Sequence, residues 1–156
     1  MQNLNAVLDS LSVCKFTALA MKEDYYARQL SAVWGEPVEP QELLLMGERI
    51  WNAERLFNLA AGFTRTDDSL PHRLLYEPVP AGPSKGQVVD LQPMLDEYYI
   101  SRGWDGGGRP SAAKLERLGL AAQAAALAAD AAAVSPSAAE DDVSAAAPPA
   151  SRAEVT

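Results

Sequence analysis

Two side chains near the start of the chain combine residue types and a spacing that can do chemistry. Asp9 and Cys14 lie five positions apart in the segment Asp9-Ser10-Leu11-Ser12-Val13-Cys14-Lys15. An ionised carboxylate accepts hydrogen bonds strongly from amine N–H groups, and a thiolate is the standard protein ligand of iron–sulfur clusters. A lone cysteine is more often a small buried residue. Residue type alone therefore leaves two roles open for Cys14, a metal ligand or a packing residue.

The other candidates for chemistry indicate structural roles. Cys14 and His72 are the single cysteine and the single histidine of the chain, which excludes an intramolecular disulfide and a self-contained Cys/His metal site. We interpret His72, which directly follows Pro71, as structural or solvent-exposed rather than as a general base. The run Gly106-Gly107-Gly108 lacks the glycine spacing and the preceding strand of a phosphate-binding loop. We expect a flexible loop there.

Composition excludes several classes of partner. The chain has 156 residues with 21 acidic and 13 basic side chains, a net charge of −8, and no block of Lys and Arg. This balance argues against nucleic acid and against anionic membranes as partners. The longest apolar stretch, around Ala121–Val134, is rich in Ala and interrupted by polar residues, so it does not predict a membrane span. The first residues lack the features of a signal peptide, which predicts a cytoplasmic location.

Apolar residues recur at helical spacing through about residues 1–120, and no stretch alternates with the period of a strand, which predicts an all-α fold. Capping and stop signals locate the helices. The expected elements are a short helix or turn before a loop at Ser10–Lys15, and helices from near Thr17 to Gly35, from Pro40 to Gly62, from about Pro71 to Tyr76, from Leu91 to Arg102, and from Ser111 to Gly119.

The same periodicity predicts which side chains face the core. Gly47 lies inside the longest helix, where glycine costs about 1 kcal/mol relative to alanine, so we expect another element to pack closely against it. The positions expected to be buried are Leu19, Tyr26, Leu30, Val33 and Trp34, then Leu43, Leu44, Gly47, Ile50, Trp51, Leu56 and Phe57, then Leu91, Met94, Leu95, Tyr98 and Tyr99, and finally Leu115 and Leu118.

Polar side chains also follow the longest helix, and two interpretations apply to them. They are either catalytic or cofactor-binding groups, or a network that orients the helix against its neighbours. We favour the network, because charged side chains on helices are ordinarily exposed. The residues are Glu48, Arg49, Asn52, Glu54, Arg55 and Asn58.

The chain changes character after residue 120. Residues 121–156 are mostly Ala, with Ser, Pro, Asp and Glu and almost no large apolar side chains. Such a stretch buries too little apolar surface to offset the entropy of ordering it. We therefore expect a helical domain over residues 1–120 and an acidic low-complexity tail over 121–156, disordered or loosely helical.

Several segments carry a resemblance to a known family by their order and spacing. They are Gly47–Asn58, Gly62–Arg73, Glu77-Pro78, Met94–Tyr99, Arg102–Asp105 and Leu118–Leu120. Read together, they resemble the C-terminal part of the aldehyde ferredoxin oxidoreductase family, and the agreement extends over most of residues 4–120. The tail has no counterpart in that family. The resemblance implies a helical domain of a tungsten or molybdenum enzyme with a bis-pterin cofactor.

By that resemblance, the segment from Asp9 to Cys14 corresponds to a family motif in which an Asp is followed at a fixed distance by Gly-Leu-Cys. The resemblance implies that Asp9 accepts hydrogen bonds from a pterin, that Cys14 is the fourth ligand of a 4Fe–4S cluster, and that Val13 lies beside them in the cofactor site. It assigns no catalytic residue. Ser12 and Val13 replace the Gly and Leu of the motif. Serine resists backbone conformations that glycine permits, so we expect Ser12 to loosen the pterin contact.

A 4Fe–4S cluster needs four thiolates, and this chain has one. In the family, the other three cysteines lie upstream. The resemblance therefore implies a truncated product, a gene-model fragment, or one piece of a split enzyme that oxidises aldehydes to carboxylic acids. Its implied partners are the upstream cofactor-binding part, in the same enzyme or in a separate subunit, and ferredoxin as the electron acceptor. The alternative is a non-catalytic helical remnant or partner-binding module.

Overall fold

The computed structural model describes residues 1–134, and these residues confirm the all-α fold. Within this range the chain has no strand, only an isolated bridge between Trp104 and Pro110. Short 3-10 helices span Lys15–Leu19 and Arg65–Asp67. The α-helices are α1 (Gln2–Ser10), α2 (Glu23–Trp34), α3 (Pro40–Ala60), α4 (His72–Tyr76), α5 (Leu91–Arg102), α6 (Ala112–Arg117) and α7 (Ala121–Val134).

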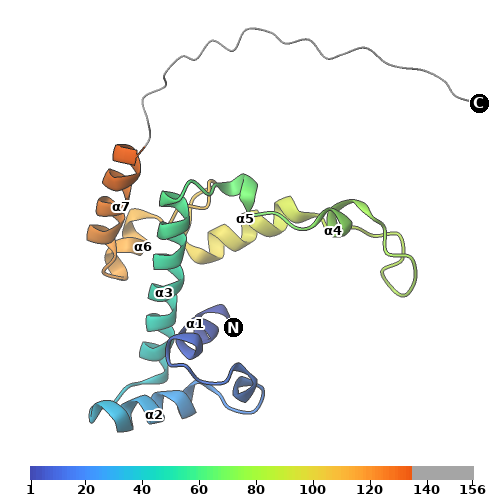
Figure 1. Cartoon of the computed structure of the whole chain (residues 1–156). Coiled ribbons are helices and arrows are strands. Elements are labelled where there is room, and N and C mark those ends of the chain that lie inside the picture. Colours follow the sequence, from blue (N-terminus) through green and yellow to red (C-terminus); the bar gives the residue numbers. More distant parts are fainter. Residues whose placement is uncertain (135–156) are drawn as a thin grey trace, which may run out of the picture.

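Helix α3 is the axis around which the other helices are arranged (Figure 1). Its first residue is Pro40, whose fixed backbone angle suits the first turn of a helix. Helices α1 and α2 lie against the N-terminal half of α3, and α7 lies against α3 and α6 at the other end. Helix α5 has one end near α3 and extends away from it toward α4, and α4 and the loop that follows it project outward (Figure 1).

The apolar core lies where α1 and α2 meet the first half of α3. Its buried members are Leu4, Val7, Leu8, Tyr26, Leu30, Val38 and Leu43. The expected close approach at Gly47 is confirmed, because a β-carbon there would lie 1.9 Å from the carbonyl oxygen of Asn3 in α1. Only glycine therefore lets α1 cross α3 at this distance.

Three helices end in the same hydrogen-bonded turn, with glycine in the left-handed conformation that the turn requires. At the end of α3, the N–H of Phe63 donates to the carbonyl of Asn58 and the N–H of Gly62 donates to that of Leu59. Gly62 has a φ of 93°. Gly103 after α5 and Gly119 after α6 occupy the equivalent position, so the stop signals expected from the sequence are confirmed.

The helix expected from near Thr17 starts later than predicted. Lys15–Leu19 is a 3-10 helix, and α2 begins only at Glu23. Tyr26 and Leu30 are buried as expected. The burial predicted for several other residues was wrong, because each helix contacts its neighbours along only one narrow stripe of its surface. The predicted core residues that are exposed instead are Leu19, Val33, Trp34, Phe57 and Met94.

The first part of the Ala-rich tail is ordered as α7. Alanine has the highest intrinsic helix propensity, and here the helix also has a surface to pack on. Ala124 and Leu127 are half-buried and line a hollow together with Leu56 and Leu59 of α3. Over Ala121–Val134 the tail is thus helical with a packing surface, and the remaining tail lies outside the described residues. No helix within residues 1–134 is long and apolar enough to cross a membrane.

Candidate functional site

Helix α1 ends in a turn that separates the two main site residues expected from the sequence. The N–H of Val13 donates to the carbonyl of Leu8 at 3.1 Å, and the N–H of Ser12 donates to that of Asp9 at 3.2 Å. This is the same turn that ends α3, α5 and α6, but here serine takes the left-handed position. Ser12 has a φ of 56°, and no other non-glycine residue in the described part of the chain has a positive φ. The glycine preference of the family motif thus has a steric reason.

Asp9 and Cys14 flank this turn, and both are exposed. Val13, between them, is half-buried and packs against the apolar core. Lys15 donates from Nζ to Oδ2 of Asp9 at 3.1 Å, so the residue after Cys14 reaches back across the turn to Asp9. The end of α1 therefore presents a carboxylate, an ammonium group and a free thiol to solvent on an anchored loop.

The backbone at Cys14 is held by a chain of hydroxyl groups. The hydroxyl of Thr17 donates to the carbonyl oxygen of Cys14 at 2.6 Å. Oγ1 of Thr17 also lies 2.7 Å from the hydroxyl of Tyr26, which must donate because the proton of Thr17 is already engaged. Tyr26 is fully buried in the core. The position of Cys14 is thus fixed from the interior, while its thiol stays accessible.

A hollow of about 490 Å³ extends from Asp9 along α1 toward α3. Asp9 and Lys15 form one end of it, and Trp51 and Glu54 of α3 contribute to its wall. Carboxylates, amide groups and an indole ring can hold a flat molecule that carries N–H donors. Gln2 and Asn5 supply the amides. Sequence reasoning did not connect Lys15, Trp51 or Glu54 with Asp9, because they converge only when α1 crosses α3.

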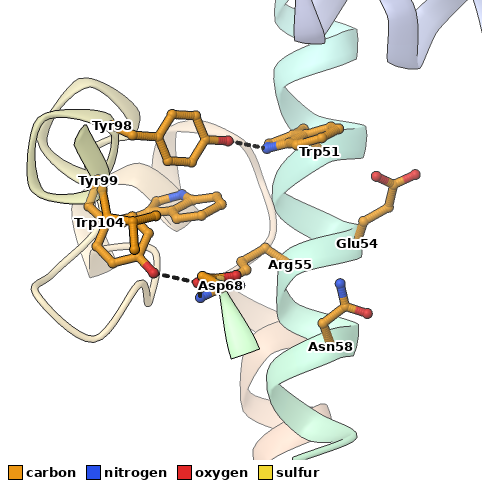
Figure 2. A pocket seen from close by; sticks show the side chains of 9 residues that line it. Trp51, Glu54, Arg55, Asn58, Asp68, Tyr98, Tyr99 and Trp104 are labelled. Carbon is orange, nitrogen blue, oxygen red and sulfur yellow. Dashed lines mark hydrogen bonds and ion pairs between the residues drawn. The ribbon is translucent and has the colours of Figure 1, made fainter. Parts of the chain in front are cut away.

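A second polar cluster lies at the C-terminal half of α3 and joins it to α5 (Figure 2). Arg55 forms two hydrogen bonds to the carboxylate of Asp68, at 2.8 and 2.6 Å, and its Nε donates to the carbonyl of Gly108 at 2.8 Å. Tyr99 donates its hydroxyl to the same carboxylate. The guanidinium also lies 5.0 Å from the ring centre of Trp104, within range of a cation–π interaction.

Two further contacts extend this cluster along α3. Asn52 is fully buried, and its Oδ1 accepts a hydrogen bond of 2.8 Å from the indole of Trp104. Nearer the start of the helix, Glu48 accepts from Lys114 at 2.5 Å and from Arg117 at 2.7 Å, both in α6. Glu48, Asn52 and Arg55 therefore orient the helix, as the network interpretation predicted, whereas Glu54 lines the hollow beside Asp9. The reason given for that interpretation was wrong, since Asn52 and Arg55 are buried rather than exposed.

The cluster perturbs three titratable groups. Burial opposes the ionisation of Asp68, but hydrogen bonds from Arg55 and Tyr99 outweigh it and hold the pKa of this carboxyl below its usual value. Burial acts in the same way on Glu48, and Lys114 and Arg117 likewise lower its pKa. Burial and the hydrogen bond to Asp68 raise the pKa of Tyr99 to about 12. Each group thus keeps its paired form over a wide pH range.

Neither the glycine run Gly106–Gly108 nor the acidic pair Asp67-Asp68 indicated this cluster at the level of sequence. Gly106–Gly108 was expected to be a flexible loop, yet Gly108 is buried and accepts from Arg55. A β-carbon on Gly108 would lie 2.3 Å from the guanidinium. Asp68, which precedes the helix expected from about Pro71, pairs with Arg55. One feature of the sequence could have indicated the site. Arg55 lies on the apolar face of α3, and a buried charge needs a partner.

The residues at the end of α1 fit one edge of a cluster and pterin site, and they do not make a complete one. Cys14 is a free, exposed thiol, so it can supply one thiolate. Nowhere in residues 1–134 do three Cys, His, Asp or Glu side chains group to hold a metal. The carboxylate of Asp9 is exposed and accepts one hydrogen bond from Lys15, which leaves acceptor positions for a further donor. His72 is exposed and contacts neither of these residues, as expected for a solvated side chain.

Comparison with known proteins identifies the family. The model of "aldehyde ferredoxin oxidoreductase, domains 2 & 3" matches residues 1–120. The chain is similar to the tungsten-containing aldehyde ferredoxin oxidoreductase of Pyrococcus furiosus, with 48% identity over 77% of this chain and 20% of the relative. The enzyme of the same name from Thermococcus kodakarensis is 47% identical over the same shares. A Pyrococcus furiosus protein named aliphatic sulfonate oxidoreductase, WOR-like subunit, is 32% identical over 75% of this chain and 20% of that relative.

The chain thus spans about a fifth of the length of the curated relatives it matches. The matched residues include the turn between Asp9 and Cys14, the crossing of α1 over α3 and the Arg55 cluster. The resemblance carried by the spacing of these segments is therefore confirmed, and the chain belongs to the aldehyde ferredoxin oxidoreductase family.

Proposed function

We propose that this chain contributes one edge of the cofactor site of a tungsten-containing aldehyde oxidoreductase. Cys14 is the fourth thiolate ligand of a 4Fe–4S cluster, and Asp9 accepts hydrogen bonds from a pterin. The observation that carries the proposal is the turn at the end of α1, which presents both side chains to solvent while Leu8, Val13 and Tyr26 anchor it in the core. Tungsten is favoured over molybdenum because the relatives near 48% identity are named as tungsten-containing.

The reaction that follows from the family is oxidation of an aldehyde and water to a carboxylic acid, with release of two electrons and two protons. Tungsten and the cluster supply the two-electron chemistry when they are bound, and ferredoxin accepts the electrons. The residues of this chain position and tune these groups. We favour an aldehyde over an aliphatic sulfonate because identity is 48% to the relatives named for aldehydes and 32% to the relative named for sulfonates.

Each side chain has a separate task at this edge. Cys14 coordinates iron through Sγ, and the hydroxyl groups of Thr17 and Tyr26 keep its backbone in place. Asp9 binds pterin N–H groups through its carboxylate, which Lys15 orients from the other side. Val13 lies beside them at the edge of the cofactor site and packs against the core beneath the loop. The remaining three thiolates come from the cofactor-binding part of the enzyme, in the same polypeptide or in a separate subunit.

Paired substitutions test the two roles. With the cofactor-binding part supplied, Cys14→Ala removes an iron ligand, so the cluster is lost or converted to a three-iron form. Asp9→Asn keeps the shape but removes a charge-assisted hydrogen bond that contributes about 1.5–3 kcal/mol. We therefore expect weaker pterin retention and a nearly normal iron content. Iron, sulfide and pterin analysis of both variants measures the difference.

Retention of a complete cluster by Cys14→Ala would refute the ligand role. The rival is a helical remnant that binds partners and catalyses nothing, and it predicts that neither substitution changes the metal or pterin content.

The domain boundary at residue 120 and the cytoplasmic location stay predictions.

A further inference from the structure

The hollow between α3 and α7 lies apart from the proposed cofactor site and has the dimensions of a ligand pocket. Its volume is about 410 Å³, and its walls include Leu56 and Leu59 of α3, Leu115 of α6 and Leu127 of α7. Small-molecule pockets are concave, mostly apolar and about 300–1,000 Å³ in volume. Helix α7 follows the residues matched by the family model, so a segment outside the matched domain forms one side of this hollow.

The hollow is open because α7 presents small side chains to α3. Ala124, Leu127 and Ala128 are three and four positions apart, so they share one face of the helix, and all three line the hollow. An alanine side chain ends at its β-carbon, so of these three residues only Leu127 extends further into the space. Helix α7 contacts both α3 and α6, which holds the walls in place. The hollow is therefore a space between packed helices that an aliphatic chain can fill.

One cation completes the lining. Among the described residues that line the hollow, only Arg109 is charged. Its backbone is fixed, since its N–H donates to Oδ1 of Asp105 at 2.9 Å and its carbonyl accepts from the N–H of Asp105 at 2.8 Å. Within residues 1–134 the guanidinium of Arg109 forms no ion pair, in contrast to that of Arg55. It is thus available to bind an anion, and a guanidinium matches the two oxygens of a carboxylate.

We infer that this hollow binds an aliphatic carboxylate, with the hydrocarbon chain between α3 and α7 and the carboxylate on Arg109. The apolar walls favour the chain because burial removes it from water, and the cation selects the charge of the head group. The inference goes beyond the proposed function and does not depend on Cys14 or Asp9, which belong to α1 and the turn after it. Helix α1 packs against the other half of α3 (Figure 1). Oxidation of an aliphatic aldehyde yields a molecule of this class, so the proposed reaction would be one source of the ligand.

Binding here links α7 to the rest of the domain. A ligand in the hollow contacts α3, α6 and α7 together, so it binds the docked arrangement of α7. A molecule that binds only one arrangement of a protein stabilises that arrangement increasingly as its concentration rises. The carboxylate therefore holds α7 against α3.

Titration of the full chain with octanoate tests the inference and requires neither a cluster nor a partner. Calorimetry measures the dissociation constant, and amide exchange measures the protection of α7. We expect octanoate to bind about tenfold more tightly than hexanoate, because two more methylene groups become buried, and to slow exchange in α7. 1-Octanol has the same chain length and no charge, so it should bind about tenfold more weakly than octanoate.

Matched variants separate the apolar walls from the cation. Ala124→Leu fills the hollow and should weaken octanoate binding by about tenfold or more. Ala126→Leu adds the same side chain at an exposed position of α7 that does not line the hollow, and it should leave the dissociation constant within about twofold. Arg109→Gln should weaken octanoate binding about tenfold and leave 1-octanol binding unchanged. Arg73→Gln, at an exposed arginine of α4, should change neither. Circular dichroism should show the same helix content in all four variants.

The inference is wrong if the unaltered chain does not bind octanoate, if octanoate and 1-octanol bind equally well, or if Ala124→Leu and Ala126→Leu weaken binding equally. Self-association of the unaltered chain in sedimentation, abolished by Ala124→Leu, would also overturn it, because the hollow would then be a contact between two copies. None of these measurements involves the iron or pterin content that tests Cys14 and Asp9. The inference and the proposed function therefore fail separately.

Discussion

The two halves of α3 are covered by different kinds of side chain. The N-terminal half is packed against Leu4, Val7 and Leu8 of α1 and against Tyr26 and Leu30 of α2. The C-terminal half carries a buried cation of its own, Arg55, which binds a carboxylate, a backbone carbonyl and the faces of aromatic rings in the elements packed against it. Along α3, the surrounding side chains therefore change from apolar to polar and aromatic.

The difference shows what each mode of packing demands. Apolar contacts are non-directional, so packing of the first half requires mainly apolar side chains of the right volume at helical spacing. The polar half requires each donor to meet its acceptor, because an unpaired buried charge is costly. The apolar half carries the proposed cofactor residues on its rim. In the second half, Trp51 and Asn52 bind Tyr98 of α5 and Trp104, while α6 is held by Glu48 near the middle of the helix. Each half should therefore respond to a different perturbation.

Removal of Asp68 should have the largest effect and should separate the two halves. Asp68→Ala leaves the guanidinium of Arg55, whose side chain is 8% exposed, without its carboxylate. We expect the free energy of unfolding to fall by about 3 kcal/mol, toward the lower end for a broken buried pair because Asp68 is partly solvated. Urea unfolding measures this loss. Amide exchange should show α5 losing protection while α1 retains it.

An exposed ion pair provides the control for this substitution. Asp24 and Arg28 lie 3.7 Å apart on α2 with their side chains 53% and 69% exposed. Asp24→Ala should change the free energy of unfolding by less than about 0.5 kcal/mol. If Asp68→Ala were as mild as this control, the Arg55 cluster would not be what stabilises the second half of α3.

Changes of pH should weaken the polar contacts of α3 and its neighbours at both extremes. The pKa values of Asp68 and Glu48 are lowered in the folded chain, so their stabilisation is fully present above the usual values of 3.8 and 4.5 and is lost as the pH falls from there through the lowered pKa values of the folded chain. The pKa of Tyr99 is raised from 10.0 to about 12, so its contribution is lost as the pH rises through that range. Unfolding free energies measured from pH 3 to pH 12 should fall at both ends.

Substitution of Tyr99 tests whether this residue causes the loss of stability at alkaline pH. Tyr99→Phe cannot ionise, so it should remove the loss of stability that Tyr99 causes between pH 10 and about 12. The acid side should remain, because the carboxyls of Asp68 and Glu48 keep their arginine and lysine partners. An alkaline loss of equal size in Tyr99→Phe would show that other groups cause it.

The smallest expected effect lies at the turn beside the proposed site. Ser12 adopts the left-handed conformation that Gly62 adopts in the matching turn after α3. Ser12→Gly should therefore raise the free energy of unfolding by about 0.5–1 kcal/mol, because glycine relieves the strain but also gains freedom in the unfolded chain. Gly62→Ser, where a β-carbon would meet nothing within 4 Å, should lower it by a similar amount. Thermal unfolding gives the melting temperatures of both variants. If neither melting temperature changed, backbone strain at Ser12 would be excluded.

The sequence by itself determined the helical class, most helix ends and the family. Glycine and proline act locally on the backbone, so Gly35, Pro40, Gly62 and Gly103 mark helix boundaries without reference to the rest of the fold. The spacing of the matched segments likewise survives in the sequence and indicates the family. The close crossing at Gly47 was also predictable, because an interior glycine needs a packing reason.

Only the tertiary structure decided which polar side chains are buried and what they meet. Arg55, Asp68 and Gly108 lie far apart in sequence, and the energy of a buried charge depends on partners that local patterns do not specify. The same holds for Leu19 and Val33, whose apolar character predicted burial although no neighbour in the described chain covers them. Helical periodicity identifies a face, but only the packing of other elements determines whether that face is filled, which is why Phe16 and Leu19 stand exposed beside Cys14.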